Sequence, residues 1–157
     1  MNMRHWDHKD PRQVDQIIGA FYLMRRDVFD HSGGFDGRFF VYFEEAGDAK
    51  RCKSAGWDSW HLTEVQAFRA GGCSSRQVKG QRLFYFLRSP LLYAFKHFRR
   101  WQAWILVGVT NVLELLTRSV WWLLRGEFAG VQNTWAAYRL LWPSMGHILR
   151  GEGRYNP

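Results

Sequence analysis

The stretch GGFDGRFFVYFEEAGDAKRCKSAGW, residues 33–57, carries the most information about the fold of this chain. Its aromatic run Phe39–Phe43 predicts a short buried strand. Acids then open a helix predicted over Glu44–Ala55, and Gly56 is the expected stop. The segment therefore predicts a strand-to-helix junction with two adjacent carboxylates, Glu44 and Glu45, in the first helical turn. Acids favour this end of a helix whatever their function, and a carboxylate held there can also take a proton from a sugar hydroxyl.

The flanking segments extend the same alternation of strands and helices. The apolar and aromatic residues of Ile17–Arg26 predict a buried strand, and Asp27 opens one or two helical turns that end at Gly33. Alternating positions after Trp57 predict a further strand up to Phe68, followed by a Gly/Ser loop. The order strand, helix, strand, helix, strand predicts an α/β layered fold.

Helices dominate the second half of the chain. A basic helix is expected over residues 77–100, and the longest apolar run follows over 101–125. The polar residues of that run share one helical face, which favours an amphipathic helix lying in a membrane interface over a membrane-spanning one; both remain open. They are Thr110, Asn111, Glu114, Thr117, Arg118 and Arg125. A shorter helix is expected to start near Asn133 and to end or kink at Pro143, before a disordered tail.

Composition narrows the classes of partner. The 157 residues carry a net charge of +8, and 17% are aromatic, nine of them Trp. Such a basic chain suits an anionic partner, and Trp together with Arg and Lys is typical of proteins at a bilayer surface. Nucleic-acid binding is disfavoured because no recognised binding motif is present and the aromatics concentrate in apolar helices. The six histidines form no ligand cluster by spacing, and Cys52 and Cys73 are expected to be reduced thiols without a function.

Three blocks of sequence carry a resemblance to a known family. They are VDQIIGAFYLMRRDVFDHSGGFDGRFF at 14–40, YFEEAGDAKRCKSAGW at 42–57, and QAFRAGGCSS at 66–75 followed by RLFYFLRSPLLYAFKHF at 82–98. Over residues 14–100 the chain resembles the acceptor-side half of family 2 glycosyltransferases, the rhamnosyltransferase-like branch in particular. The resemblance implies an α/β fold, the C-terminal half of a GT-A (Rossmann-like) domain, followed here by amphipathic helices.

The resemblance also implies roles for individual residues. Glu45 corresponds to the catalytic base and Glu44 to its neighbouring acid. Acceptor binding is implied for Gly33, Gly34, Phe35 and Arg51, although a helix stop with a turn and a solvated helix charge would explain the same residues. Contact with a diphosphate is implied for Arg69 and Ser74.

Two positions depart from the family pattern. The family's Asp two residues after the base is Gly47 here, with Asp48 one place later. The family's loop His is Arg69, which cannot ligate a metal but can contact a diphosphate.

The 157 residues contain neither an Asp-x-Asp motif nor the nucleotide-binding half of the family. No metal or cofactor is expected to bind this chain alone, whereas Mg²⁺ or Mn²⁺ is expected in a complete family member. The chain is therefore expected to be a truncated or split glycosyltransferase, inactive alone, which would need a separate nucleotide-binding half.

The expected organisation is an N-terminal arm (1–15), the acceptor-side part (16–100), membrane-associated helices (101–150) and a tail (151–157). The expected partners are a saccharide or lipid-linked acceptor and the cytoplasmic face of the plasma membrane, with no nucleic acid. The alternative function is a non-catalytic membrane-surface module that retains the acceptor-side fold.

Overall fold

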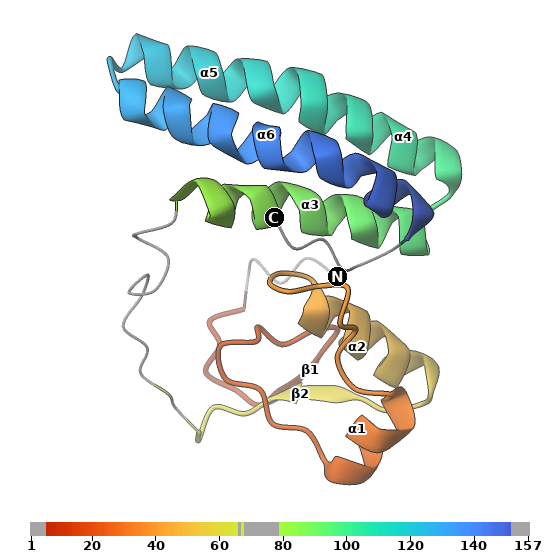
Figure 1. The fold of residues 1–157 in the computed structure, drawn as a ribbon. Helices are drawn as coiled ribbons and strands as arrows, with labels where there is room; N and C mark the ends of the chain where they lie inside the picture. The colour runs from red at the N-terminus through yellow and green to blue at the C-terminus, as the bar shows by residue number, and fades with distance from the viewer. Residues whose placement is uncertain (1–5, 66, 68–78, 152–157) are drawn as a thin grey trace. The chain divides into compact units, whose positions relative to one another are not determined.

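The computed structural model describes residues 6–65, 67 and 79–151 (Figure 1). The chain forms two compact units: unit 1 comprises Met1–Asp36 and Glu44–Gly71, and unit 2 comprises Gly37–Phe43 and Gly72–Pro157. In chain order the elements are β1 (Arg12–Val14), α1 (Arg26–Ser32), α2 (Glu44–Ser54), β2 (Ser59–His61), α3 (Lys79–His97), α4 (Arg100–Gly108), the π-helical turn η1 (Val109–Glu114), α5 (Leu115–Leu124) and α6 (Phe128–Arg150).

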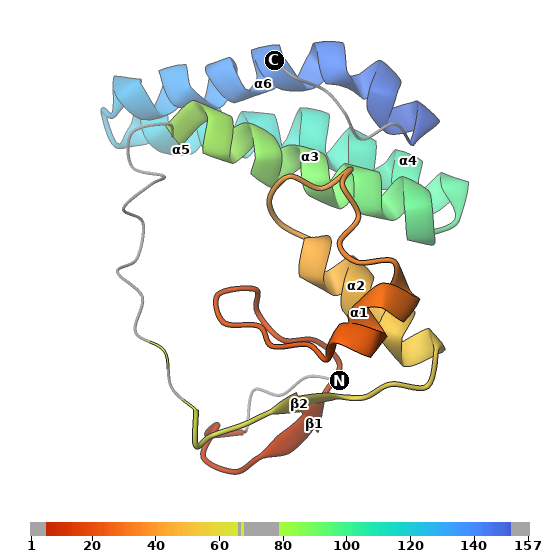
Figure 2. The same ribbon diagram turned by 60° about the horizontal axis from the view of Figure 1, so that its bottom comes forward.

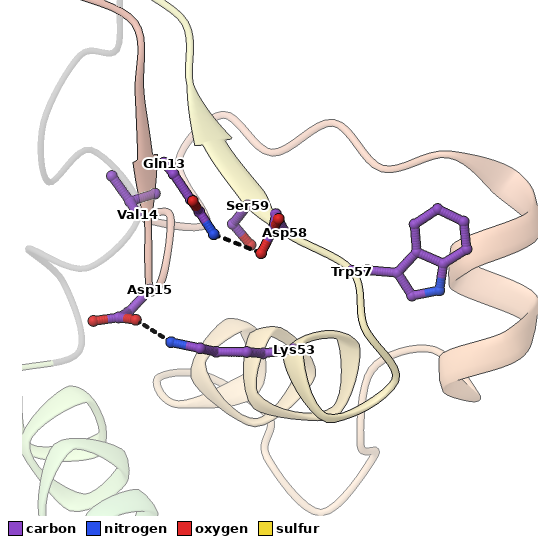
Figure 3. A pocket seen from close by; sticks show the side chains of 7 residues that line it. All are labelled: Gln13, Val14, Asp15, Lys53, Trp57, Asp58 and Ser59. Atoms are coloured by element: carbon purple, nitrogen blue, oxygen red, sulfur yellow. Dashed lines mark hydrogen bonds and ion pairs between the residues drawn. The ribbon is translucent and has the colours of Figure 1, made fainter.

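Unit 1 holds a small antiparallel sheet and two short helices. Strand β1 pairs with β2 in a register that sets Gln13 opposite Trp60. Side chains tie the sheet to its surroundings, as Figure 3 shows: Lys53 Nζ lies 2.5 Å from Asp15 Oδ1, and Gln13 Nε2 donates to Asp58 Oδ1 at 2.6 Å. These pairs line a small surface cavity of about 160 Å³ that does not include the acid pair.

A larger hollow in unit 1, about 710 Å³, has mainly apolar walls. Ile18 and Leu23 on its wall are 74% and 76% exposed. Soluble proteins rarely leave such contiguous apolar surface open unless another surface covers it.

Unit 2 is a layer of helices around one apolar core. Helices α4, η1 and α5 form one continuous run, and α6 lies antiparallel beside it after a turn at Gly126 (Figures 1 and 2). Helix α3 packs against α6. The close approach of α6 to α5 needs glycine at position 130, where a Cβ would overlap the Trp122 indole. The core residues are Phe39, Phe84, Leu87, Leu91, Leu92, Leu115, Ala137, Tyr138, Leu141 and Ile148.

Two polar residues in the middle of the Arg100–Leu124 run, Thr110 and Asn111, contact α6. The Tyr138 hydroxyl donates to the Thr110 carbonyl at 2.5 Å, and Trp142 Nε1 donates to Asn111 Oδ1 at 3.1 Å. Tyr138 thereby gives the Thr110 carbonyl a partner inside the π-helical turn, where the regular α-helical pattern is interrupted. Glu114 is paired with Arg118 at 2.6 Å.

The opposite face of this run is apolar and exposed. Its large exposed side chains are Trp101, Trp104, Ile105, Val109, Val112, Leu113, Leu116, Val120, Trp121, Leu123 and Leu124. Only 17% of its most apolar 18-residue window is buried within the protein. Judged by length and composition alone, Arg100–Leu124 is the one helix in the described part of the chain that is long and apolar enough to cross a membrane.

Several expectations about the elements are confirmed. The helix expected over 44–55 is α2, the basic helix is α3, and the short helix before Gly33 is α1. Gly33 ends α1 in the left-handed conformation, with φ of 77°.

Other expectations are wrong. Ile17–Arg26 forms no strand. Phe39–Phe43 is irregular: the Ser89 hydroxyl of α3 donates to the Val41 carbonyl, and Arg88 of α3 donates to the carbonyl of Arg38 just before the run. Of the expected strand over Trp57–Phe68, only Ser59–His61 is a strand within the described residues. Helix α6 starts before Asn133 and continues through Pro143, because Ser144 and its neighbours are held in the core.

Candidate functional site

Glu44 and Glu45 open helix α2 as expected, at the point where the chain passes from unit 2 to unit 1. One carboxylate oxygen of each, Oε2 in both cases, is shielded from solvent and has no hydrogen-bond partner within the described structure. A shielded carboxylate oxygen without a partner is costly in a folded protein and marks a place where a ligand group can bind.

The pair is electrostatically coupled. Burial raises the pKa of Glu44, a backbone hydrogen bond opposes that rise, and the charge of Glu45 and a hydrogen bond with it raise the pKa further. Glu44 therefore holds its proton more tightly than an ordinary glutamate does. Two adjacent carboxyl groups in unequal environments can divide the acid and base roles of a reaction.

Gly19 lies beside Glu45 of the acid pair. A Cβ at Gly19 would lie 3.7 Å from Glu45 Cδ and 3.9 Å from each of its carboxylate oxygens. The backbone of the Ile17–Arg26 segment therefore lies directly beside the Glu45 carboxylate, with no side chain between them. Any group longer than a methyl at position 19 would compete with a ligand for this space.

The Gly33–Gly34 turn is built as its sequence indicates. Both glycines have positive φ, 77° and 67°, which other residues rarely adopt. A Cβ at Gly34 would also lie 2.7 Å from Phe29 Cζ. Phe35 follows with 47% of its surface exposed, and its ring lies 6.0 Å from that of Tyr22. The turn therefore presents an exposed aromatic ring, a feature suited to stacking against a sugar.

Arg51 holds this turn from helix α2. Its Nε donates to the Ser32 carbonyl at 3.1 Å, and its Nη2 donates to the Gly34 carbonyl and to Asp48 Oδ1. The side chain is 27% exposed, so it is not a solvated helix charge. Arg51 positions the turn, and its role in acceptor binding stays a prediction.

Asp48 is the hub of this network. It is fully buried and accepts hydrogen bonds from Tyr22 Oη at 3.2 Å, Ser32 Oγ at 3.1 Å and Arg51 Nη2 at 3.0 Å. Burial and the charge of Asp48 raise the pKa of the Tyr22 phenol. Asp48 thus joins three segments around the acid pair: the one containing Tyr22, the end of α1, and α2.

Two aromatic residues immediately before the acids have strained backbones. Tyr42 and Phe43 have φ of 67° and 70°, in the left-handed region. Each such residue costs on the order of 1–3 kcal/mol and persists only where contacts impose it. Both rings pack on α3 within unit 2, Tyr42 against Phe86 and Phe43 against Tyr93. Strain of this kind is typical of functional sites.

Two predicted site residues, Arg69 and Ser74, lie outside the described residues, as does Cys73. Cys52 is buried, and burial raises its pKa. Within residues 6–65, 67 and 79–151, no three His, Cys, Asp or Glu side chains gather to hold a metal ion. These residues do not provide a metal site, so no chemical step is assigned to a metal held by them.

The sequence interpretation missed two members of the site. Asp48 was noted only as a displaced family acid, and Gly19 was quoted without a role. The signal for Gly19 was its place in the Gly-Ala-Phe turn; the signal for Asp48 was its i,i+3 spacing to Arg51.

Comparison with known proteins finds a distant similarity to a glycosyltransferase. Over 101 residues the chain is 30% identical to N-acetylglucosaminyl-diphospho-decaprenol L-rhamnosyltransferase of Mycobacterium tuberculosis, in both strain CDC 1551 / Oshkosh and strain H37Rv. The match covers 62% of this chain and 33% of the enzyme, so the chain spans about a third of these curated relatives. No family model and no solved structure matches. The similarity supports a relationship to a glycosyltransferase.

Proposed function

We propose that this chain is the acceptor-side part of a family 2 glycosyltransferase with a GT-A fold, and that Glu45 is its general base. The observation that carries the proposal is the acid pair at the start of α2, with a shielded and unpartnered oxygen on each carboxylate. The similarity to a rhamnosyltransferase supports sugar transfer as the reaction class.

The chemistry follows from the position of Glu45. As the acceptor hydroxyl oxygen bonds to the anomeric carbon of the donor sugar, Glu45 takes the hydroxyl proton. The bond from that carbon to the nucleoside diphosphate breaks, and the diphosphate leaves with the electron pair. A positioned base of this kind contributes typically about 10²–10⁴-fold to the rate. Glu44, whose pKa is raised by burial, is the neighbouring acid of the pair.

The proposed acceptor is a lipid-linked or cell-envelope saccharide at the inner face of the plasma membrane. The relative's name specifies a diphospho-decaprenol acceptor, and this chain carries an exposed apolar helical face in α4–α5. Phe35, beside the Arg51-held turn, is the residue we assign to contact with the acceptor sugar.

The donor would be held by a separate nucleotide-binding half, with Mg²⁺ or Mn²⁺ in the complete enzyme. The 157 residues contain no Asp-x-Asp motif, so we expect them to bind acceptor without transferring sugar. The open apolar hollow of unit 1 is the surface we assign to that half.

The test uses the full chain with N-acetylglucosaminyl-diphospho-prenol in detergent, supplemented with the nucleotide-binding half of the mycobacterial relative and nucleotide-activated rhamnose. We expect transfer only when both polypeptides are present.

Glu45→Gln should lower the rate at least about 100-fold and leave acceptor affinity unchanged, because only the proton transfer is lost. Glu64→Gln, which neutralises an exposed acid of the same unit, is the matched control. Full activity in Glu45→Gln removes Glu45 from the base role. Acceptor binding without transfer in any combination favours the non-catalytic membrane-surface module.

A further inference from the structure

A basic cavity in unit 2 has no part in the acid-pair site. It measures about 400 Å³, within the roughly 300–1,000 Å³ of small-molecule sites. It lies where the C-terminal parts of α3 and α6 meet the start of α4. Four of its nine lining residues are cationic, namely Arg38, Lys96, Arg100 and Arg150. None of the described lining residues is acidic.

The cavity also has apolar walls. Phe39 and Leu92 are buried in the core and form its floor, and Leu149 lies at its edge with 37% exposure. Cations beside apolar walls suit a ligand with a phosphate joined to a hydrocarbon. A free inorganic anion would leave the apolar walls without a partner.

Neutralisation of helix ends does not account for this charge. The C-termini of α3 and α6 each carry about half a negative charge, and the N-terminus of α4 carries about half a positive one. Arg100, the first residue of α4, and Arg150, in the last turn of α6, alone bring two full positive charges. Arg38 Nη1 already donates to the Gly151 carbonyl at the end of α6, at 3.2 Å. Positive potential therefore remains in the cavity.

The cavity adjoins one end of the apolar face. Arg100 lines the cavity, and Trp101 and Trp104 begin the exposed apolar face with 58% and 52% of their surfaces exposed. Trp beside Arg marks the headgroup level of a bilayer. The apolar face of α4–α5 in hydrocarbon would bring the cavity to the depth of lipid phosphates.

We propose that this cavity binds the phosphate or diphosphate of a phosphorylated lipid, with the first carbons of the lipid chain against Phe39, Leu92 and Leu149. The inference rests on the proposed function and assigns it a binding site for the lipid-linked part of the acceptor, separate from the acid pair. Arg100 and Arg150 supply the charge-assisted hydrogen bonds.

The test compares full-length protein on phosphatidylcholine vesicles that contain a small fraction of prenyl diphosphate or, at equal negative charge, phosphatidylglycerol. We expect the wild type to prefer the prenyl diphosphate vesicles. The double variant Arg100→Gln/Arg150→Gln should lose at least about tenfold in affinity for them, and with it the preference. Arg125→Gln/Arg139→Gln removes the same charge from exposed positions of α6 and the α5–α6 turn and should keep the preference.

Equal losses in both double variants, or no preference in the wild type, would overturn the proposal. Titration of the wild type with inorganic diphosphate provides a second arm that does not depend on a variant folding. If inorganic diphosphate binds weakly and competes with prenyl diphosphate, the result supports a lipid site. If inorganic diphosphate binds as tightly as prenyl diphosphate, the apolar walls do not contribute to binding and the proposal is overturned. Glu45→Gln should bind these vesicles like the wild type. A preference for prenyl diphosphate vesicles without sugar transfer would therefore reject the proposed catalysis and support this lipid site. Sugar transfer without that preference would support the catalysis and reject the lipid site.

Discussion

The proposed insertion of the α4–α5 apolar face into lipid predicts that a lysine within that face weakens membrane partitioning. Leu116 lies in the second half of the Arg100–Leu124 run and is 59% exposed. Burying a whole Leu side chain is worth about 1.5–3 kcal/mol, so the exposed part of Leu116 contributes about 1–2 kcal/mol on entering lipid. A lysine near the bilayer centre costs about a further 2.5–3.5 kcal/mol. Leu116→Lys should therefore weaken membrane partitioning by about 3.5–5.5 kcal/mol, or on the order of 10³-fold.

The size of the loss discriminates between two depths of insertion. If the α4–α5 face only rests in the headgroup region, the lysine amine can reach water along its own stem and the loss shrinks to about tenfold or less. Burial of Thr110 and the hydrogen bond from Trp142 to Asn111 withdraw these two residues from the outer face, and the exposed Thr117 hydroxyl donates to the Leu113 carbonyl of its own helix; both features suit the deeper position.

The assay is flotation with phosphatidylcholine vesicles over a range of lipid concentrations, since zwitterionic lipid avoids attraction of the added charge. Gln132→Lys adds the same charge at an exposed polar position of α6 and serves as the control. Helix content should be unchanged in both variants by circular dichroism. Wild-type protein that stays out of the lipid fraction, or Leu116→Lys that floats as the wild type does, would refute the reasoning.

Two further predictions concern the acid-pair site. Because the pKa of Glu44 is raised in the folded protein, ionising it as pH rises above its ordinary value of 4.5 lowers stability. Glu44→Gln should therefore raise the melting temperature at neutral pH, and this gain should vanish in acid. A gain that persists in acid would show that ionisation of Glu44 is not its cause. Asp48→Asn should lower the free energy of unfolding by about 3 kcal/mol in urea titration, because a buried acceptor of three hydrogen bonds loses its charge. The exposed control Asp30→Asn should change it by less than about 0.5 kcal/mol, and equal effects would exclude Asp48 as the hub.

Local signals account for the parts of the fold that sequence predicted well. Acids at the start of α2, basic residues near its end and Gly56 after it define that helix, and Gly33 stops α1, because these preferences act within one or two turns of backbone. The long apolar run likewise gave a helix of nearly the expected length.

Strands were predicted poorly because a strand needs a partner that local sequence does not supply. The aromatic run at Phe39–Phe43 has strong strand propensity, yet Ser89 of α3 donates to its Val41 carbonyl, Arg88 donates to the preceding Arg38 carbonyl, and its rings pack on that helix. Two of its residues accept left-handed backbones as a result.

The sequence by itself determined that Glu44 and Glu45 stand together at a helix start, since adjacency and helix signals are properties of neighbouring residues. Only the tertiary structure decided what surrounds them and where the polar stripe of α4–α5 points. Asp48 and Gly19 reach the site through contacts between segments well separated in the chain. The Thr110 carbonyl and the Asn111 side chain accept hydrogen bonds from Tyr138 and Trp142 of α6, and the apolar side of the run is left outward. Helical periodicity separates the two faces of a helix, and packing against its neighbours determines which of them is covered.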